Sequence, residues 1–222
     1  MYDVFKFNLG RDCLKYLVNK YEIEQMYVPY YLCDVIRHTL VENGCRPLFY
    51  HIDDNFYPQT EFTKESYILY PNYFGICGQN VEKLVNIYPK LIVDNAHAYY
   101  NKPQGFACFN AGHKFGHKTS YLWISNKGNK SEIDRDNFYP SDNRLSFLEL
   151  HKKYSSTNLL KISTENLICP FVYPYLAETI EIADLLAEGL KKEGKTIYRY
   201  WNPLPQSFNE YKFYSRLVPI PL

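Results

Sequence analysis

Three stretches of the sequence carry residue types that could bind a small anionic ligand and act on it. NLGRDCLKYLV places Gly10 directly before a helical pattern, where backbone N–H groups and a helix N-terminus can approach a phosphate. KLIVDNAHAYY leads an apolar run into Asp94, with His97 close behind it. FACFNAGHKFGHKTSYLWI places Lys114 and Lys118 in a glycine-rich loop between two apolar runs. Together these types offer an anion site, a carboxylate and a nucleophilic amine.

Each of these residues also has an ordinary structural interpretation, and the residues alone leave the choice open. A glycine before a helix is usually structural, and a lysine is usually a solvated charge. Asp94 could cap the turn that follows it, and His97 could be a buried structural histidine. Alternatively, Asp94 could bind magnesium together with Asp53 and Asp54 and serve a phosphotransfer reaction.

The elements that would position these residues alternate along the first part of the chain. Short apolar runs predict strands at Met26–Pro29, Pro47–Ile52, Tyr67–Pro71, Leu91–Asp94, Gly105–Asn110 and Ser120–Ile124. Apolar residues at helical spacing predict helices at Asp12–Tyr21, Leu32–Asn43 and Gln79–Tyr88. This alternation is typical of a mostly parallel sheet, in which ligands bind outside the carboxyl ends of the strands. Asp94 stands at such an end.

The sequence changes character after Ile124 and predicts a second, smaller unit. Residues 125–143 are polar, charged and rich in helix breakers, which predicts a linker. The pattern beyond it predicts a helix at Arg144–Tyr154, an extended piece at Ile168–Tyr173, a helix at Glu178–Glu193, a strand at Lys195–Trp201 and an irregular, proline-rich tail. The second helix would bury a stripe of Ile182, Leu185, Leu186 and Leu190. The expected division is therefore 1–124, 125–143 and 144–222.

The composition fits an ordinary globular protein and argues against several classes of partner. Of 222 residues, 46% are hydrophobic and 22% charged, and the net charge of +1 offers no basic surface for nucleic acid. No apolar run approaches the roughly 18 residues of a membrane span, and the N-terminus has no leader pattern. The six cysteines form no CxxC pair, so we expect a cytoplasmic protein with reduced thiols. The 23 tyrosines suggest half-buried rings, as at an oligomer interface.

The order of these motifs resembles a known enzyme family. Residues 72–124 look like the middle of the DegT/DnrJ/StrS sugar aminotransferases, which depend on pyridoxal 5′-phosphate (PLP) and have fold type I. The stretches NLGRDCLKYLV and YVPYYLCDVIRHTLVENGCRPLFYHID resemble the elements before that region, and PFVYPYLAE, YRYWNPLP and LVPIPL resemble parts of the family's small domain. The resemblance implies an α/β fold: a three-layer α/β/α, mostly parallel sheet, as in the large domain of aspartate aminotransferase, with a truncated small α+β C-terminal unit.

The resemblance also implies roles for the residues of the three stretches described first. Lys114 matches the lysine that holds PLP covalently, and Asp94 matches the carboxylate that pairs with the pyridine nitrogen. His97 matches the position that approaches the phenolic oxygen, and Gly10 and Arg11 match the turn that binds the phosphate. In this interpretation Lys114 would act as nucleophile and as general base and acid. No metal ligand is implied.

Three other site positions match the family pattern less directly. The family usually stacks an aromatic ring on the cofactor. The matching position in this sequence is Cys33, and Tyr31 is the nearest residue with a ring. Asn110, at the end of the strand before the lysine loop, is also expected to contact the cofactor. Since the loop reads KFGHKTS where relatives read KFFG followed by a DG turn, Lys118 competes with Lys114 for the covalent role.

The resemblance implies transfer of an amino group from an amino-acid donor to a nucleotide-linked keto-sugar, for surface polysaccharide synthesis, by a homodimer. The chain is shorter than the family, without the arm before the first helix and with a helical block missing around Ser125–Asn137. These departures favour an alternative: a degenerate, catalytically inactive relative that acts as a dimeric binding or structural protein.

Overall fold

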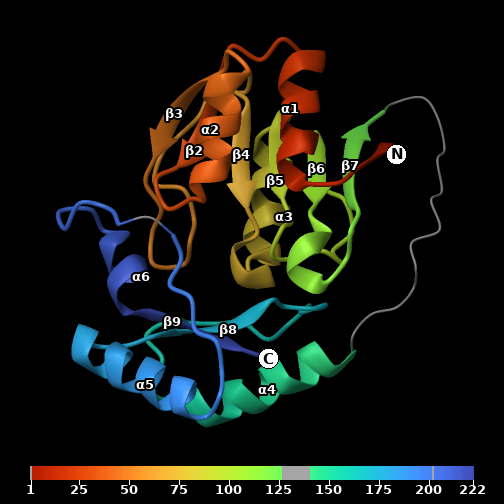
Figure 1. Cartoon of the computed structure of the whole chain (residues 1–222). Coiled ribbons are helices and arrows are strands. Elements are labelled where there is room, and N and C mark those ends of the chain that lie inside the picture. Colours follow the sequence, from red (N-terminus) through yellow and green to blue (C-terminus); the bar gives the residue numbers. More distant parts are fainter. Residues whose placement is uncertain (1, 127–140, 202) are drawn as a thin grey trace.

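The computed structural model describes residues 2–126, 141–201 and 203–222. The predicted linker at 125–143 lies mainly outside them. Within the described residues, the larger sheet has seven strands in the order β1-β7-β6-β5-β4-β2-β3 (Figure 1). Their bounds are Tyr2–Phe7 (β1), Gln25–Pro29 (β2), Arg46–Tyr50 (β3), Ile68–Pro71 (β4), Leu91–Asp94 (β5), Ala107–Asn110 (β6) and Ser120–Ser125 (β7).

The middle of this sheet is parallel and one edge is antiparallel. Strands β2 to β6 run parallel to one another, whereas β7 runs antiparallel to both β6 and β1. The six predicted strands are confirmed, with small shifts at their ends. Strand β1 was missed, because its charged residues Asp3 and Lys6 interrupt the apolar run. Its apolar side chains pack on both faces of the sheet.

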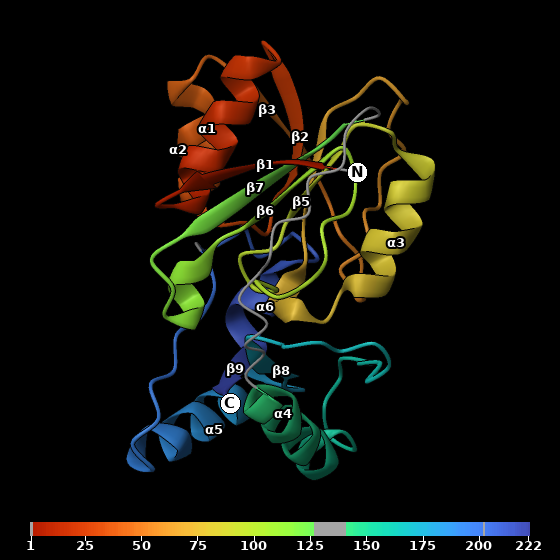
Figure 2. The ribbon, with the colours of Figure 1, turned by 90° about the vertical axis from the view of Figure 1, so that its right-hand side faces the viewer.

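Helices cover both faces of the sheet, which confirms the predicted three-layer α/β/α fold (Figure 2). Helices α1 (Gly10–Lys20) and α2 (Asp34–Glu42) lie on one face, and α3 (Gly78–Ile87) lies on the other. The central strands alternate between the two cores, since Leu91 and Val93 join the cluster with α3 while Ile92 joins the cluster with α1 and α2. A strand buried on both faces therefore reads as a continuous apolar run.

The C-terminal unit is a two-stranded antiparallel sheet with three helices in the described residues. Its elements are α4 (Ser141–Tyr154), β8 (Val172–Leu176), α5 (Ile180–Lys192), α6 (Tyr211–Arg216) and β9 (Leu217–Pro221). The predicted strand at Lys195–Trp201 is wrong, because those residues pair with no strand. The tail is also not an irregular strap, since it supplies α6 and the strand β9 that pairs with β8. The predicted extended piece is strand β8, which begins at Val172.

Helix α5 confirms the predicted buried stripe only in part. Its buried residues are Ala183, Ala187 and Leu190, whereas Ile182 is 40% exposed and Leu185 is 70% exposed. The Thr179 hydroxyl accepts the Ile182 N–H and starts the helix. Because alanines have short side chains, this face lets α5 approach α6 and β9 closely. Of the predicted stripe, Leu190 is therefore buried and Leu186 packs against the core, whereas Ile182 and Leu185 point to solvent.

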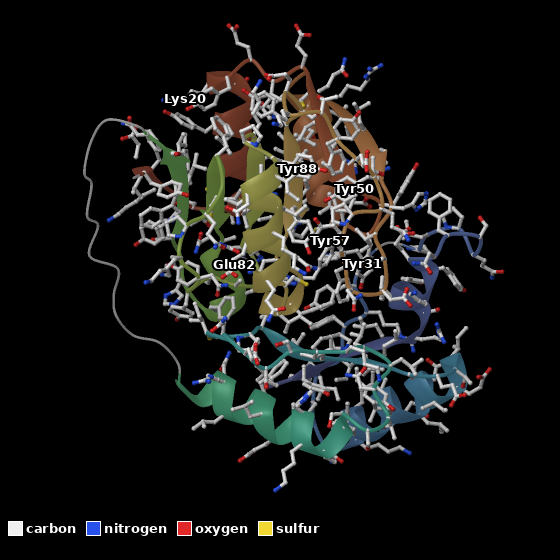
Figure 3. All side chains as sticks on the ribbon, turned by 180° about the vertical axis from the view of Figure 1, so that it is seen from behind. Lys20, Tyr31, Tyr50, Tyr57, Glu82 and Tyr88 are labelled. Atoms are coloured by element: carbon white, nitrogen blue, oxygen red, sulfur yellow. The ribbon has the colours of Figure 1, made fainter. Side chains whose placement is uncertain are left out.

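The C-terminal unit lies at the carboxyl ends of the large sheet (Figures 1 and 3). Buried aromatic residues of both parts pack there in one cluster. Tyr31, which lies at this end of the sheet, donates its hydroxyl to the carbonyl of Tyr200, 2.8 Å away. Tyr73 donates to the carbonyl of Tyr31 at 2.9 Å. Tyr50 and Tyr70 are likewise fully buried and donate to carbonyls. These tyrosines thus build the interior rather than an exposed interface.

Two further findings concern the whole of the described chain. None of its helices is long and apolar enough to cross a membrane. All six cysteines are thiols, five of them buried and Cys33 half-buried.

Candidate functional site

A cavity of about 240 Å³ opens at the carboxyl ends of β4, β5 and β6, beside the first turns of α1 and α2. Elements from both units form its walls, because Trp201 of the C-terminal unit lines it as well. Six of the eight predicted site residues lie in its lining: Gly10, Arg11, Cys33, Asp94, His97 and Lys114. The cavity is therefore the place where the residues singled out from the sequence meet.

Asp94 ends β5 and is a buried carboxylate with one oxygen committed. Its side chain is 8% exposed, and Oδ1 accepts the backbone N–H of Ala96 at 2.8 Å. Oδ2 accepts no hydrogen bond from the described residues. Burial raises the pKa of Asp94 to about 6, and the Ala96 N–H and the charge of Lys114 oppose that rise. Asp94 thus caps the following turn and still offers an acceptor to a ligand.

His97 is a buried, neutral imidazole whose orientation is fixed by a hydrogen bond from the backbone of Phe74. Its Nδ1 lies 3.2 Å from the backbone N–H of Phe74 and accepts it, so the ring proton lies on Nε2. Burial lowers the pKa of His97 well below its ordinary value, and the charges of Lys114 and His113 lower it further. The ring therefore stays neutral at physiological pH and can donate from Nε2.

The turn that holds His97 is under backbone constraint. Phe74 has a φ of 55°, in the left-handed region that side chains with a Cβ rarely adopt. The next residue, Gly75, has a φ of 79°, and a Cβ there would lie 2.6 Å from the carbonyl oxygen of His97. Because Gly75 has no Cβ, its turn can contact the loop that holds His97, and the Phe74 N–H comes within hydrogen-bonding distance of the imidazole.

Lys114 places an amine in the cavity without a hydrogen-bond partner among the described residues. It stands on the short 3₁₀ turn Gly112–Phe115 and is half-buried. Its Nζ lies 5.0 Å from the ring centre of Phe171 and 4.8 Å from that of Tyr200. Burial lowers the pKa of Lys114, although nearby Cys33 and Asp94 oppose this shift. Lys118, by contrast, is exposed and lies outside the cavity lining.

The first turn of α1 forms the side of the cavity that suits an anion. Gly10 and Arg11 are its first two residues and both line the cavity. First-turn N–H groups have no partner within a helix and carry its positive dipole end. A Cβ on Gly10 would lie 2.9 Å from the Cβ of Ala111, so the glycine also serves packing against the end of β6. The structural interpretation of Gly10 is therefore confirmed, and its phosphate-binding role stays a prediction.

Tyr31 and Asn110 lie outside the lining and have other partners. The Tyr31 ring is fully buried and its hydroxyl binds the Tyr200 carbonyl. The Asn110 amide donates to the carbonyls of Tyr99 and Asn101, 2.6 and 3.0 Å away. Asn110 thereby holds the loop that follows Asp94, which makes it a support for the site.

Asn72 and Trp201 are among the lining residues that were not predicted from the sequence. Asn72 follows the end of β4 as Asp94 ends β5, so its position at a strand end is a signal that could have found it. Its amide accepts from the Cys77 N–H and donates to Asn95, which ties the two loops together. Trp201 comes from the C-terminal unit, and no local pattern in the sequence places it here.

The magnesium alternative has no supporting geometry. Asp53 and Asp54 line a different cavity from Asp94. Asp53 Oδ1 accepts the N–H groups of Asn55 and Tyr57, and Asp54 pairs with Lys212. No group of three or more histidine, cysteine or acidic residues in the described part of the chain could hold a metal ion.

Comparison with known proteins yields matches only among solved structures. No family model matches the sequence, and no curated protein matches it. A DegT DnrJ EryC1 StrS aminotransferase from Brucella abortus superposes with a TM-score of 0.72 at 14% identity, over 99% of this chain and 80% of that one. The chain has the fold of these aminotransferases.

Two further structures carry the same fold. NtdA from Bacillus subtilis, solved with bound cofactor PMP, has a TM-score of 0.71 at 14% identity and covers 99% of this chain and 68% of its own. PseC of Helicobacter pylori, an aminotransferase involved in the biosynthesis of pseudoaminic acid, gives 0.63 at 15% identity, over 98% and 81%. The resemblance read from the sequence thus agrees with the three-dimensional aminotransferase fold, in a shorter chain.

Proposed function

We propose that the protein is a PLP-dependent aminotransferase that transfers the amino group of an amino acid to a nucleotide-linked keto-sugar. One observation carries the proposal: the Lys114 amine and the Asp94 carboxylate line one small cavity beside the first turn of α1. An amine, an acid and an anion site at the carboxyl edge of a parallel sheet are the groups that a phosphorylated pyridine aldehyde requires.

The residues in the cavity fit this cofactor at each of its functional groups. The free Oδ2 of Asp94 can accept the N–H of a pyridinium ring. The Nε2–H of His97 can donate to a phenolic oxygen, since Nδ1 is occupied by the Phe74 N–H. The first-turn N–H groups of Gly10 and Arg11 can receive a phosphate.

The cofactor, when bound, supplies an electron sink for the charge that develops at the Cα of the amino acid. Asp94 would keep the ring nitrogen protonated and so strengthen that sink. Lys114 would take the Cα proton on Nζ as general base and would then donate it, as general acid, to the cofactor carbon that bears the nitrogen. The burial that lowers the pKa of Lys114 favours the neutral amine that this task needs.

A neighbouring cavity offers room for the acceptor. It measures about 490 Å³ and shares Leu32 and Cys33 with the first cavity. Tyr30 and Phe49 stack there with ring centres 5.1 Å apart. Arg37 lies beside them and pairs with Asp34 of the same lining at 3.0 Å, so its guanidinium is held in place there. Aromatic faces and a guanidinium are suited to a nucleobase and its phosphates. The fold shared with PseC supports a sugar acceptor.

The test is covalent labelling of the lysine. The protein is saturated with PLP, reduced with borohydride and digested, and the labelled peptide is identified by mass spectrometry. We expect the label on Lys114 in the wild type and in Lys118→Ala, and no label in Lys114→Ala. Labelling of Lys118, or no labelling at saturating PLP, would contradict the proposal. Label on Lys114 with no amino transfer to a panel of keto-sugar nucleotides would refute its enzymatic part.

The proposal includes a homodimer. Val35 lies in the cavity wall and is 44% exposed, and Arg11 at the same wall is also exposed, so this side of the cavity lies open at the surface. A second copy of the chain could cover it. Light scattering coupled to gel filtration should give twice the mass of the chain, and a monomer at micromolar concentration would contradict this part.

A further inference from the structure

The indole of Trp201 forms a wall of the candidate cofactor cavity although it belongs to the C-terminal unit. It lies in the segment between α5 and α6 and is half-buried. Its ring is nearly parallel to that of His97, with an angle of 16° and ring centres 5.6 Å apart. It also meets the edge of Tyr31 at 4.7 Å. An aromatic face is thus presented beside the groups that would hold the cofactor.

Buried hydrogen bonds fix the backbone on which Trp201 stands. The Tyr31 hydroxyl donates to the carbonyl of Tyr200, the residue directly before the tryptophan, at 2.8 Å. Tyr31 is itself held by the Tyr73 hydroxyl at its carbonyl. Because both tyrosines are fully buried, the indole is positioned before any ligand arrives. Part of its surface remains open to the cavity, since it is half-buried and lies in the lining.

The other lining residues leave this role open. Cys33 carries only a thiol at the position where the family resemblance expects a ring. Phe109 is 1% exposed, because it packs in the core beneath α1 and α2. Trp201 therefore offers the largest aromatic surface that a flat ligand can meet in this cavity.

We propose that Trp201 packs its indole against the pyridine ring of PLP, so that the C-terminal unit completes the cofactor site. This inference rests on the proposed function. A pyridinium ring that is kept protonated by Asp94 carries positive charge, and indole has the most favourable aromatic face for a cation. Trp201 is a binding residue in this scheme. It supplies the aromatic contact to the cofactor that Cys33, which has no ring, cannot make.

The first test measures affinity with pyridoxamine 5′-phosphate, which forms no covalent bond with Lys114. Equilibrium dialysis should give a Kd about tenfold weaker for Trp201→Ala. Trp201→Phe, which keeps a ring, should stay within about threefold of the wild type. The matched control is Trp123→Phe, at the only other tryptophan of the chain, which lies outside the lining and should leave the affinity unchanged. Equal affinities for Trp201→Ala and the wild type would overturn the inference.

The second test reads the indole directly and needs no truncating variant. Trp123→Phe leaves Trp201 as the single tryptophan, which is excited selectively at wavelengths that tyrosine does not absorb. Saturating pyridoxamine 5′-phosphate should lower the rate of acrylamide quenching of Trp201 at least threefold, because the ligand would cover its open face. Unchanged quenching with the ligand bound would overturn this inference alone. A wild type that binds no pyridoxamine 5′-phosphate, and gives no borohydride label, would overturn the proposed function as well.

Discussion

Two cavities of this molecule differ in size and in what their charged groups do. The larger, of about 680 Å³, is lined by Asp53, Asp54 and the start of α3, and these two aspartates bind groups of their own chain. Asp53 accepts two backbone N–H groups, and Asp54 pairs with Lys212. The smaller, of about 240 Å³, holds Asp94 and Lys114, each with hydrogen-bonding capacity left unused by the described residues.

The difference teaches that unused polar capacity under burial identifies the site better than volume does. Asp53 also keeps Oδ2 unused, since both N–H groups bond to Oδ1, but Asp53 is only half-buried and Asp54 is exposed, so water can serve these carboxylates. Burial has raised the pKa of Asp94 and lowered that of Lys114, which costs folding stability until a ligand compensates. Matched substitutions in the two cavities can test whether this difference has functional consequences.

The largest effect is expected from one carboxylate in each cavity. Asp94→Asn should slow the cofactor-dependent half-reaction with an amino acid by on the order of 10²–10⁴, because the ring nitrogen loses its anionic partner. Asp54→Asn, in the larger cavity, should stay within about twofold of the wild type. Rapid-mixing absorbance measurements on the PLP-loaded proteins would check both. Equal losses in the two variants would remove the distinction between the cavities.

Asp94→Asn should also stabilise the protein without cofactor, in a pH-dependent way. Burial raises the folded pKa from 3.8 to about 6, so the folded state binds the proton more tightly than the unfolded state. The wild type therefore loses stability as pH rises from 3.8 to 6. The gain from the amide should reach at most about 3 kcal/mol at pH 8 and vanish below pH 3.8. Urea unfolding across this range would measure it, and a gain independent of pH would contradict the burial argument.

Two glycines that start helices offer the next comparison. Gly10 begins α1 and Gly78 begins α3, and each lines one cavity. Gly10→Ala should cost about 1–3 kcal/mol and weaken phosphate binding, since its Cβ would lie 2.9 Å from that of Ala111.

A Cβ on Gly78 meets nothing within 4 Å, which makes it the matched control. Gly78→Ala should be neutral or stabilise by about 0.5 kcal/mol, because alanine reduces the freedom of the unfolded chain. The free energies of unfolding in urea and dialysis with inorganic phosphate would decide. Similar losses at both glycines would mean that the close packing of α1 on β6 has no special importance.

The fold was predictable where burial leaves a local pattern. The central strands are buried on both faces, so they read as apolar runs such as Leu91–Asp94. The C-terminal unit was less predictable, because Lys195–Trp201 has strand-forming residues but β8 pairs with β9 instead. In α5, Ala183 and Ala187 face the core beside Leu190, whereas Leu185 does not, and this choice depends on how closely α6 and β9 approach.

The candidate site divides in the same way. Asp94, His97 and Lys114 follow strand ends, so the rule for parallel sheets could bring them together. Asn110 also ends a strand, but its amide faces the Tyr99 and Asn101 carbonyls, which only the loop path determines. Trp201 reaches the cavity through long-range packing, and such contacts leave no signal in the neighbouring sequence.

The smallest expected effect is on stability, at Asp54, and its sign is opposite to that at Asp94. The ion pair with Lys212 lowers the pKa of Asp54 below its usual 3.8, so the paired carboxylate stabilises the fold at neutral pH. This contribution should disappear as pH falls through the folded pKa. Because the Asp54 side chain is 75% exposed, Asp54→Asn should cost less than about 0.5 kcal/mol at pH 7 and nearly nothing in high salt.

Urea unfolding of Asp54→Asn beside Asp94→Asn, at the same pH values, gives the comparison its sharpest form. One amide should weaken the protein slightly at neutral pH and the other should strengthen it, with both differences closing in acid. Two amides that both weaken the protein at pH 8 would mean that Asp94 is compensated within the chain. In that case its free oxygen would no longer point to a ligand.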